Sequence, residues 1–370
     1  MPLIIVGGGF SGLVNSYFAE ESILYEEHRS VGYPSHCTGL VSTRFVSALG
    51  SVSRENIVNK YRSITVNDLG GKELITLRTE AIYRLDREKL ERDLLKESLD
   101  KGSKISLRTR ILDIEELDRE TICLAIHKLD ENIVTRNCFS EEGIILLADG
   151  VLGNLSRRYI QRNKRDLLLG AQVVIESSRS YFDTENIHVF VSDKLFPRFF
   201  GWLVPISEKK AIIGGGFELD SRINIMLKYF LHNLKKIGFI GDFSIKRFFG
   251  GLITRSLATQ HVFERIVVGG DAAGLTKAFT GGGLYPSLYQ AIAVRDAISR
   301  SSDASDFSRV YNRSMKIFVK ELLLQKIFTE YVSRIGVERF VRILSSRISS
   351  IYIDYDYHIG LLRLFLRVIG

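Results

Sequence analysis

The chain opens with a pattern of apolar and glycine positions that predicts a β-α-β unit. An apolar run at residues 3–6 predicts a strand, a glycine-rich stretch follows it, and helical spacing continues to about residue 20. A second apolar run at residues 22–25 predicts another strand, which ends at Glu26. This order of elements is typical of a Rossmann-type dinucleotide-binding fold.

The segment after residue 60 predicts a hairpin followed by a helix. Residues 63–66 and 73–77 are rich in β-forming side chains and flank a Gly-Gly pair, which is a common hairpin turn. Asp86 stands where a helix N-cap is expected, and residues 87–99 have helical spacing.

The rest of the first 300 residues alternates between predicted strands and helices. Residues 104–147 contain strand-like segments, and residues 168–218 mostly alternate between polar and apolar side chains and are rich in aromatics, which predicts strands. Ser221 is placed to cap the next helix. A strand at residues 265–268 and a helix at residues 284–300 follow.

The glycine-rich turn after the first strand has the spacing of a dinucleotide-binding fingerprint. Gly7 permits a tight turn, Gly9 lets the backbone approach a pyrophosphate, and Gly12 lets the helix pack closely on the strand. The free N–H groups at the start of the helix would face the phosphates. Glu26 is placed to accept hydrogen bonds from the ribose of an adenosine, and Glu27 is the alternative. A purely structural turn is the other interpretation.

Two further segments resemble those of the para-hydroxybenzoate hydroxylase-like flavoproteins. Residues 144–150 are similar to the strand-plus-Asp-Gly segment of that superfamily, and residues 267–274 are similar to its Gly-Asp segment. The resemblance implies FAD as the cofactor, with Asp271 on the ribityl chain and Asp149 near the pyrophosphate. Arg87 matches an arginine that precedes the first long helix of these proteins and often lies near their cofactor.

Three consecutive glycines precede the predicted helix at residues 284–300. Their N–H groups can approach a ligand closely, and the helix dipole would stabilise an anionic reduced flavin. A plain helix start with flexible glycines is the alternative. The predicted cofactor-binding residues are Gly7, Gly9, Ser11, Gly12, Glu26, Arg87, Asp149, Gly150, Asp271, Gly281, Gly282 and Gly283.

Residues 32–39, Gly-Tyr-Pro-Ser-His-Cys-Thr-Gly, resemble the GxPxxCxG loop of the geranylgeranyl reductase family. The cysteine of that family lies near the flavin. The resemblance therefore implies Cys37 as a catalytic residue that tunes the flavin or relays a proton. A buried, inert cysteine is the alternative.

Residues 200–205 resemble the YxWxFP segment of the same family. Trp202 is retained, whereas Phe200 and Val204 replace the tyrosine and the phenylalanine of that segment. Phe200 and Trp202 are predicted catalytic-site residues, because an aromatic wall suits an isoprenoid chain. A core strand is the alternative. Ala278 replaces a proline that the family usually has, which predicts a more mobile loop.

Composition and charge limit the partners and the cellular compartment expected for the protein. The formal net charge of +8 suits an anionic partner, such as a membrane surface or an acidic electron-carrier protein, or simply favours solubility. No nucleic-acid-binding signature is present, so we expect no nucleic-acid partner. The 3 cysteines form no CxxC pair, which predicts a reducing compartment rather than disulfides and excludes a four-thiolate iron–sulfur cluster. No metal site is predicted.

The sequence predicts no transmembrane helix, because no apolar run reaches about 18 residues. A strand directly behind the first residue leaves no room for a signal peptide, so we expect a cytoplasmic protein. Residues 361–369 place Arg363 and Arg367 on one helical face against a broad apolar face. This composition is typical of an interfacial helix, which would give peripheral membrane contact at the inner surface. It equally fits a final helix that packs on the core, which is the default interpretation, or one that lines a lipid tunnel.

The predicted fold class is α/β, with a Rossmann-type FAD-binding domain, an inserted antiparallel-sheet substrate domain and a helical C-terminus. The FAD-binding domain is predicted to be discontinuous, at residues 1–165 plus 250–300, and the substrate domain to span residues 166–249. Residues 50–85 are expected to join the substrate domain, and residues 301–370 to form the helical C-terminal region.

The resemblance implies an FAD-dependent oxidoreductase of lipid biosynthesis that saturates isolated double bonds of geranylgeranyl chains on a lipid or a diphosphate. Because the sequence has a single dinucleotide-binding pattern, the electron donor is expected to be transiently bound NAD(P)H or a redox protein. Three alternatives remain: an FAD-dependent aromatic monooxygenase, a flavoprotein electron-transfer or quinone reductase, and a protein that keeps FAD without redox chemistry.

Overall fold

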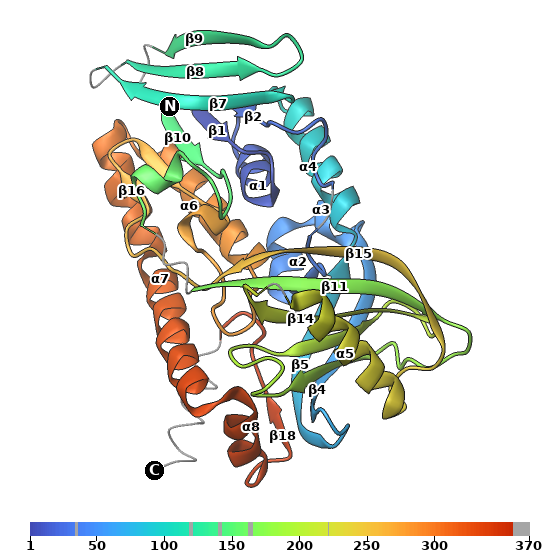
Figure 1. The fold of residues 1–370 in the computed structure, drawn as a ribbon. Helices are drawn as coiled ribbons and strands as arrows, with labels where there is room; N and C mark the ends of the chain where they lie inside the picture. The colour runs from blue at the N-terminus through green and yellow to red at the C-terminus, as the bar shows by residue number, and fades with distance from the viewer. Residues whose placement is uncertain (34–35, 118–120, 140–142, 162–165, 221, 358–370) are drawn as a thin grey trace.

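The computed structural model describes residues 1–33, 36–117, 121–139, 143–161, 166–220 and 222–357. Figure 1 shows a smaller sheet with its helices in the upper half of the molecule and a larger sheet in the lower half. The long helix α7 (Ala304–Ile335) runs along both. Within the described residues the strands form sheets of six, nine and three.

The six-stranded sheet has the order β16-β17-β10-β1-β2-β6. β1 pairs in parallel with both β10 and β2, so the first strand of the chain is central, as in a Rossmann-type fold. The strands are β1 (Leu3–Val6), β2 (Ser22–Tyr25), β6 (Lys104–Ser106), β10 (Ile144–Leu147), β16 (Val262–Phe263) and β17 (Ile266–Val268).

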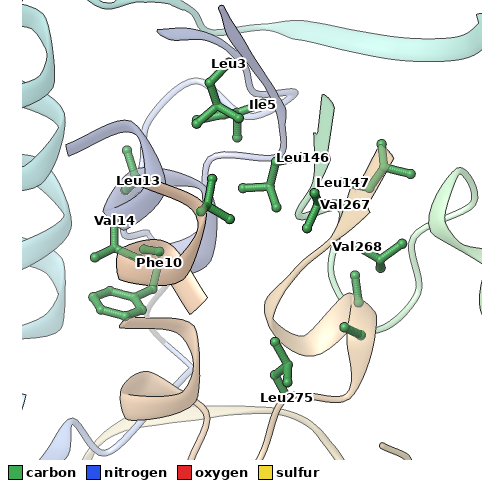
Figure 2. Close-up of a cluster of buried hydrophobic side chains, with 14 of the residues drawn as sticks. Leu3, Ile5, Phe10, Leu13, Val14, Leu146, Leu147, Val267, Val268 and Leu275 are labelled. Carbon is green, nitrogen blue, oxygen red and sulfur yellow. The ribbon is translucent and has the colours of Figure 1, made fainter. Parts of the chain in front are cut away.

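All residues of β1 and β10 are buried, as expected for parallel strands that helices cover. Figure 2 shows this core, where Leu146 of β10 lies between Ile5 of β1 and Val267 of β17. The helices packed around it are α1 (Phe10–Phe18), α4 (Arg87–Asp100) and α6 (Leu284–Arg300). The carboxylate of Asp86 caps α4 as predicted, because it accepts a hydrogen bond from the N–H of Lys89 at 3.0 Å.

The larger sheet has the order β15-β11-β14-β13-β12-β4-β5-β18, with β3 beside β5. Most neighbouring strands are antiparallel, whereas the β12–β4 and β18–β5 pairs are parallel. Phe190 on β12 packs with α5 (Ile223–Lys236), and its neighbour Val191 packs with α8 (Val337–Ser345), so the two helices cover opposite faces. The strands are β3 (Leu40–Ser42), β4 (Ile57–Asp68), β5 (Glu73–Leu85), β11 (Leu167–Ser177), β12 (Asn186–Val191), β13 (Gly201–Pro205), β14 (Lys210–Glu218), β15 (Phe243–Thr254) and β18 (Ser350–Tyr352).

The three-stranded sheet corrects one prediction about the cysteines. β8 pairs with β9 so that Cys123 lies directly opposite Cys138, and the two form a disulfide. The expectation of cysteines without a disulfide was therefore wrong for this pair, because cross-strand register is not visible in the spacing of cysteines along the chain. The strands are β7 (Thr109–Glu116), β8 (Ile122–Lys128) and β9 (Ile133–Phe139).

The predicted fold class is confirmed, although several elements differ in detail. The predicted hairpin is longer than its β-rich runs, and β4 and β5 belong to the larger sheet. The C-terminal region is helical in α7 and α8, but it then adds β18, a parallel partner of β5. The prediction of helix throughout this region was therefore incomplete, since local spacing does not reveal a partner so distant in the chain.

Some predictions fall on residues that the structure does not describe. These are the cap at Ser221 and the amphipathic segment 361–369. The domain limits stay a prediction. Among the described residues, no helix combines the length and the apolar character needed to cross a membrane. Short helices α2 (Thr43–Leu49) and α3 (Ser51–Arg54) follow β3.

Candidate active site

A cavity of about 1140 Å³ begins at the carboxyl ends of β1, β10 and β17 and continues between the larger sheet and α8. Its first part, lined by residues such as Gly9, Asp149 and Asp271, is here called the dinucleotide arm. All predicted cofactor-binding residues except Gly12 line the cavity, as do Cys37, Phe200 and Trp202. The structure thus brings together side chains from segments far apart in the sequence.

Steric constraints explain the glycines of the first turn. Gly7 has a φ angle of +105°, and a Cβ atom there would lie 2.3 Å from the carbonyl oxygen of Ala148. A Cβ atom on Gly12 would lie 1.9 Å from the carbonyl oxygen of Gly7. A Cβ atom on Gly9 would meet nothing within 4 Å, so the backbone here is open to the cavity. The turn combines the close packing and the open backbone that pyrophosphate binding requires.

The buried carboxylate of Glu26 supports this turn from the side. Its Oε2 atom accepts a hydrogen bond from the N–H of Gly8 at 2.5 Å, and its Oε1 atom accepts one from the N–H of His28 at 2.8 Å. Glu27 instead pairs with Arg110 at 2.6 Å. Both carboxylates line the cavity. Contact with the glycine turn favours Glu26 for the ribose, which stays a prediction.

Asp149 and Asp271 follow the ends of β10 and β17. The Oδ2 atom of Asp149 accepts hydrogen bonds from the N–H groups of Leu155 and Ser156, both at 3.1 Å, and so shapes the loop that leads into the 3-10 helix η1 (Ser156–Arg158). Asp271 lies in the 3-10 helix η3 (Gly270–Ala273), exposed on the cavity wall. The two carboxylates therefore face the cavity from neighbouring strand ends.

The polar lining of the cavity fits FAD. Buried polar groups are normally hydrogen-bonded, so a cluster of unpaired ones on a cavity wall indicates a polar ligand. Within the described part of the chain, four buried side-chain atoms on this wall have no partner: Ser11 Oγ, Arg87 Nε, Asp149 Oδ1 and Thr280 Oγ1. This mixture of donors and acceptors matches the phosphates and hydroxyls of a dinucleotide.

The N-terminus of α6 also meets the cavity. Gly281, Gly282 and Gly283 line it, and α6 begins at Leu284 without a hydrogen bond from a capping side chain. A helix start of this kind leaves N–H groups and a partial positive charge available to an acceptor. The placement favours the predicted interaction with a reduced flavin, which stays a prediction.

Cys37 lies on the cavity wall with its thiol free and exposed, so the alternative of a buried cysteine does not hold. Its sulfur accepts a hydrogen bond from the N–H of Gly39 at 3.3 Å. The guanidinium of Arg87 contacts the thiol and forms a buried ion pair with Glu91. Burial alone would lower the pKa of Arg87, but its interactions with Glu91 and Cys37 together outweigh burial and raise this pKa. Pro34 of the same loop is outside the described residues.

Gln172 on β11 connects this loop to Trp202, and sequence reasoning missed it. Its Oε1 atom accepts hydrogen bonds from Nε1 of Trp202 at 3.2 Å and from Oγ1 of Thr38 at 3.0 Å. Its Nε2 atom donates to the carbonyl oxygen of His36 at 3.2 Å. A glutamine in an alternating strand gives no signal of such partners, since they come from two segments distant in the chain.

Phe200 and Trp202 form part of an aromatic wall. Phe200 stacks on Phe199 with ring centroids 4.3 Å apart, and the Trp202 ring lies edge-on at 6.3 Å from Phe200. Phe200 and Trp202 are half-buried and line the cavity rather than the closed core, which favours the predicted wall over the core-strand alternative. Phe199 is a further member of this wall that the sequence reasoning did not identify.

The second part of the cavity lies between the larger sheet and helices α7 and α8, and is here called the apolar arm. Its wall consists of aliphatic and aromatic side chains, which suit a hydrocarbon ligand. Those residues include Val66, Ile75, Val191, Phe328, Val341 and Leu344. Phe279, from the loop before α6, and Ile353, after β18, also line the cavity.

Comparisons by sequence identify reductases. The chain is 24% identical over 361 residues to digeranylgeranylglycerophospholipid reductase 2 of Methanothermobacter thermautotrophicus, covering 93% of this chain and 91% of the relative. It is 22% identical over 348 residues to the digeranylgeranylglycerophospholipid reductase of Methanococcus aeolicus, covering 89% and 86% of the two chains. No protein-family profile matches the chain.

Comparisons by structure identify the same fold. A geranylgeranyl bacteriochlorophyll reductase-like protein of Thermoplasma acidophilum superposes with a TM-score of 0.84 at 16% identity, over 100% of this chain and 95% of the other. The p-nitrophenol 4-monooxygenase of Pseudomonas putida superposes with a TM-score of 0.73 at 13% identity, over 100% and 98%. Together with the sequence relatives, these likenesses confirm the predicted resemblance and the predicted class, an FAD-dependent oxidoreductase.

Proposed function

We propose that this protein is an FAD-dependent reductase that saturates isolated double bonds of a geranylgeranyl chain on a lipid or a diphosphate. The observation that carries the proposal is one continuous cavity, polar in the dinucleotide arm and apolar between the larger sheet and α8. An apolar arm binds a hydrocarbon by removing it from water. The names of the relatives, digeranylgeranylglycerophospholipid reductases, support this substrate class.

The residues of the dinucleotide arm would hold FAD. In this proposal Gly9 and the start of α1 bind the pyrophosphate, Glu26 binds the ribose, and Asp271 binds the ribityl chain. The unpaired atoms of Ser11 and Thr280 would gain partners when FAD is bound. The chemistry supplied by bound, reduced FAD is delivery of a hydride to one carbon of the alkene.

Cys37 would supply the proton that the other alkene carbon requires. An isolated alkene has no carbonyl group to take up negative charge, so protonation must keep pace with hydride delivery. The Cys37 thiol is held by the N–H of Gly39 and the guanidinium of Arg87, and its exposure lets it recover a proton from solvent. Phe200 and Trp202 would keep the alkene oriented and exclude water from it.

We further propose that the outward face of α7 contacts an anionic membrane surface, from which a lipid substrate would come. Ile317 and Ile327 are exposed apolar residues on this helix, with Arg313, Lys316 and Lys320 exposed beside them. Exposed apolar side chains flanked by basic ones are typical of interfacial helices. The inward face of α7 and α8 lines the apolar arm, so the same helices would border both lipid environments.

An anaerobic turnover tests the reaction. Protein with bound FAD, reduced by dithionite, is mixed with geranylgeranyl diphosphate or with a geranylgeranylated glycerolipid, and the products are weighed by mass spectrometry. A gain of two hydrogens per double bond supports the proposal and ranks the two head groups. Replacing dithionite by NADH, by NADPH or by a reduced ferredoxin then identifies the class of electron donor.

Oxidation of the flavin without any change in lipid mass would contradict the proposal. The monooxygenase alternative, favoured by the fold shared with p-nitrophenol 4-monooxygenase, predicts instead that oxygen is consumed in step with an aromatic substrate. An oxygen electrode with 4-nitrophenol and NADPH distinguishes the two reactions.

A further inference from the structure

A buried ion pair lies beneath the glycine loop that precedes α6. The Nζ atom of Lys277 lies 3.1 Å from Oδ1 of Asp356, and the two side chains are only 4% and 1% exposed. Removing one partner of such a pair leaves an uncompensated buried charge, so the pair strongly resists separation. Neither residue has a role in the reaction proposed above.

Lys277 supports the loop with both its backbone and its side chain. Its N–H donates to the carbonyl oxygen of Gly282 at 3.0 Å, and its carbonyl oxygen accepts from the N–H of Gly281 at 2.7 Å. A Cβ atom on Gly282 would lie 2.9 Å from Cε of Lys277, so the side chain passes directly under the loop. The position of the lysine therefore determines where the loop backbone lies.

Asp356 anchors the other end of the pair. Its carboxylate accepts a hydrogen bond from the hydroxyl of Ser42, the residue that caps α2. The neighbouring carbonyl oxygen of Tyr355 accepts a second hydrogen bond from Nζ of Lys277, at 2.9 Å, and Tyr355 is one of the residues that line the cavity. Arg44 of α2 adds an ion pair with Asp354 at 2.8 Å. The segment 353–357 is thus fixed to α2 and to the glycine loop at once.

We propose that Lys277 is a positioning residue which, through Asp356, fastens segment 353–357 to the glycine loop and so sets the N–H groups of Gly282 and Gly283 against FAD. This inference rests on the proposed flavin site.

Three variants and one control test the inference. The single variants Lys277→Met and Asp356→Asn each leave one charge buried without its partner, whereas the double variant removes both charges. Lys235→Met is the matched control, because Lys235 pairs with Asp242 at 2.6 Å on the exposed surface. FAD affinity is measured by fluorescence titration, the flavin midpoint potential by redox titration, and backbone mobility of the protein without added FAD by hydrogen exchange.

Each single variant is expected to bind FAD about tenfold more weakly, within the usual range of coupling between sites. The double variant should recover part of this loss, because residues that act as a pair are not additive. Displacing the loop should reduce the preference for reduced over oxidised FAD about tenfold, which lowers the midpoint potential by about 30 mV for a two-electron couple. Hydrogen exchange should rise in residues 276–283 and 353–357 together.

Unchanged FAD affinity, potential and exchange in Lys277→Met would overturn the inference. A variant that only unfolds at a lower temperature, with FAD affinity and potential intact, would also overturn it and leave the pair a purely structural feature. If the wild-type protein fails to bind FAD, the proposed function falls. The exchange experiment still decides whether Lys277 and Asp356 couple the two segments.

Discussion

Trp202 and Gln172 are joined by a hydrogen bond from the indole Nε1 to the amide Oε1 at 3.2 Å, although they lie on β13 and β11, which β14 separates. The same oxygen accepts from Thr38, next to Cys37 in the chain. The aromatic wall and the thiol loop therefore share one support. Any movement of the Gln172 side chain should therefore displace both the aromatic wall and the thiol loop.

Replacing Gln172 by Leu should therefore loosen the thiol loop. The change leaves Trp202, Thr38 and His36 without their shared partner, and because these hydrogen bonds are partly buried each loss should cost about 1 kcal/mol. Denaturant unfolding should show the lower stability, and Cys37 should react faster with a chromogenic thiol reagent. The control is Gln260→Leu, at an exposed position. Equal thiol reactivity in both variants would argue against the support.

Replacing Glu26 by Ala should weaken FAD binding. The carboxylate holds the N–H of Gly8 in the glycine turn, and hydrogen bonds to charged groups contribute about 1.5–3 kcal/mol. We expect FAD affinity to fall by about tenfold or more. Glu27→Ala removes the neighbouring carboxylate, which pairs with Arg110, and should have a smaller effect. FAD occupancy measured by absorbance that is unchanged in Glu26→Ala would contradict the ribose assignment.

Filling the apolar arm should select against long chains. Val341 on α8 lines the cavity, so Val341→Trp would occupy the space that a geranylgeranyl chain needs. Overpacking costs about 1–3 kcal/mol, so the fold should survive. We expect kcat/KM to fall at least about tenfold for geranylgeranyl diphosphate and less for geranyl diphosphate. Ile343→Trp, on the exposed side of the same helix, should leave both values unchanged.

Charges on the outward face of α7 should weaken membrane binding. The double variant Ile317→Glu and Ile327→Glu replaces two exposed apolar residues, each able to contribute about 1.5–3 kcal/mol when buried in an interface. Flotation with vesicles containing phosphatidylglycerol should recover less of this variant than of the wild type. Ile225→Glu on α5 is the control, at a similarly exposed site. Equal loss in the control would show that the contact is not specific to α7.

His261 should make the protein less stable in mild acid. Burial lowers its pKa from 6.5 to about 4, because the charged ring would be desolvated. As the pH falls below about 6.5 the unfolded chain takes up this proton first, so folding loses up to about 3 kcal/mol by pH 4. His261→Gln should flatten this part of the curve of unfolding free energy against pH. His232→Gln, at an exposed position, should not.

Sequence reasoning succeeded where the signal is local. The strand at Leu3–Val6, the cap at Asp86 and the helix at Leu284–Arg300 match the structure because spacing, capping and glycine turns act within a few residues. The glycine fingerprint and the two aspartate segments also identified residues that line one cavity, since each motif lies at the end of a strand, and their role in binding FAD stays a prediction. Among the predicted cofactor-binding residues, Gly12 is the exception, because it packs against the first strand and does not line the cavity.

The features that escaped prediction depend on partners far away in the chain. Gln172, the cross-strand disulfide and β18 are each defined by a register or a contact that no local window contains. Lys277 and Asp356 are 79 residues apart, and each alone reads as an ordinary surface charge. The expected mobility of the loop at Ala278 stays a prediction, made without knowledge of this pair. The residues that hold the site in position are therefore defined by tertiary contacts, whereas the residues that line its dinucleotide arm are recognisable from local motifs.

Because Cys123 and Cys138 are bonded to each other, Cys37 is the only free thiol among the three cysteines. A maleimide fluorophore or a nitroxide added to the unmodified protein would therefore attach at a single place, on the wall of the cavity. Entry of a hydrocarbon chain would then change the emission colour of the dye or the line shape of the spin label. Ligand binding could therefore be followed with a label on Cys37 of the natural chain, without introducing or removing any cysteine.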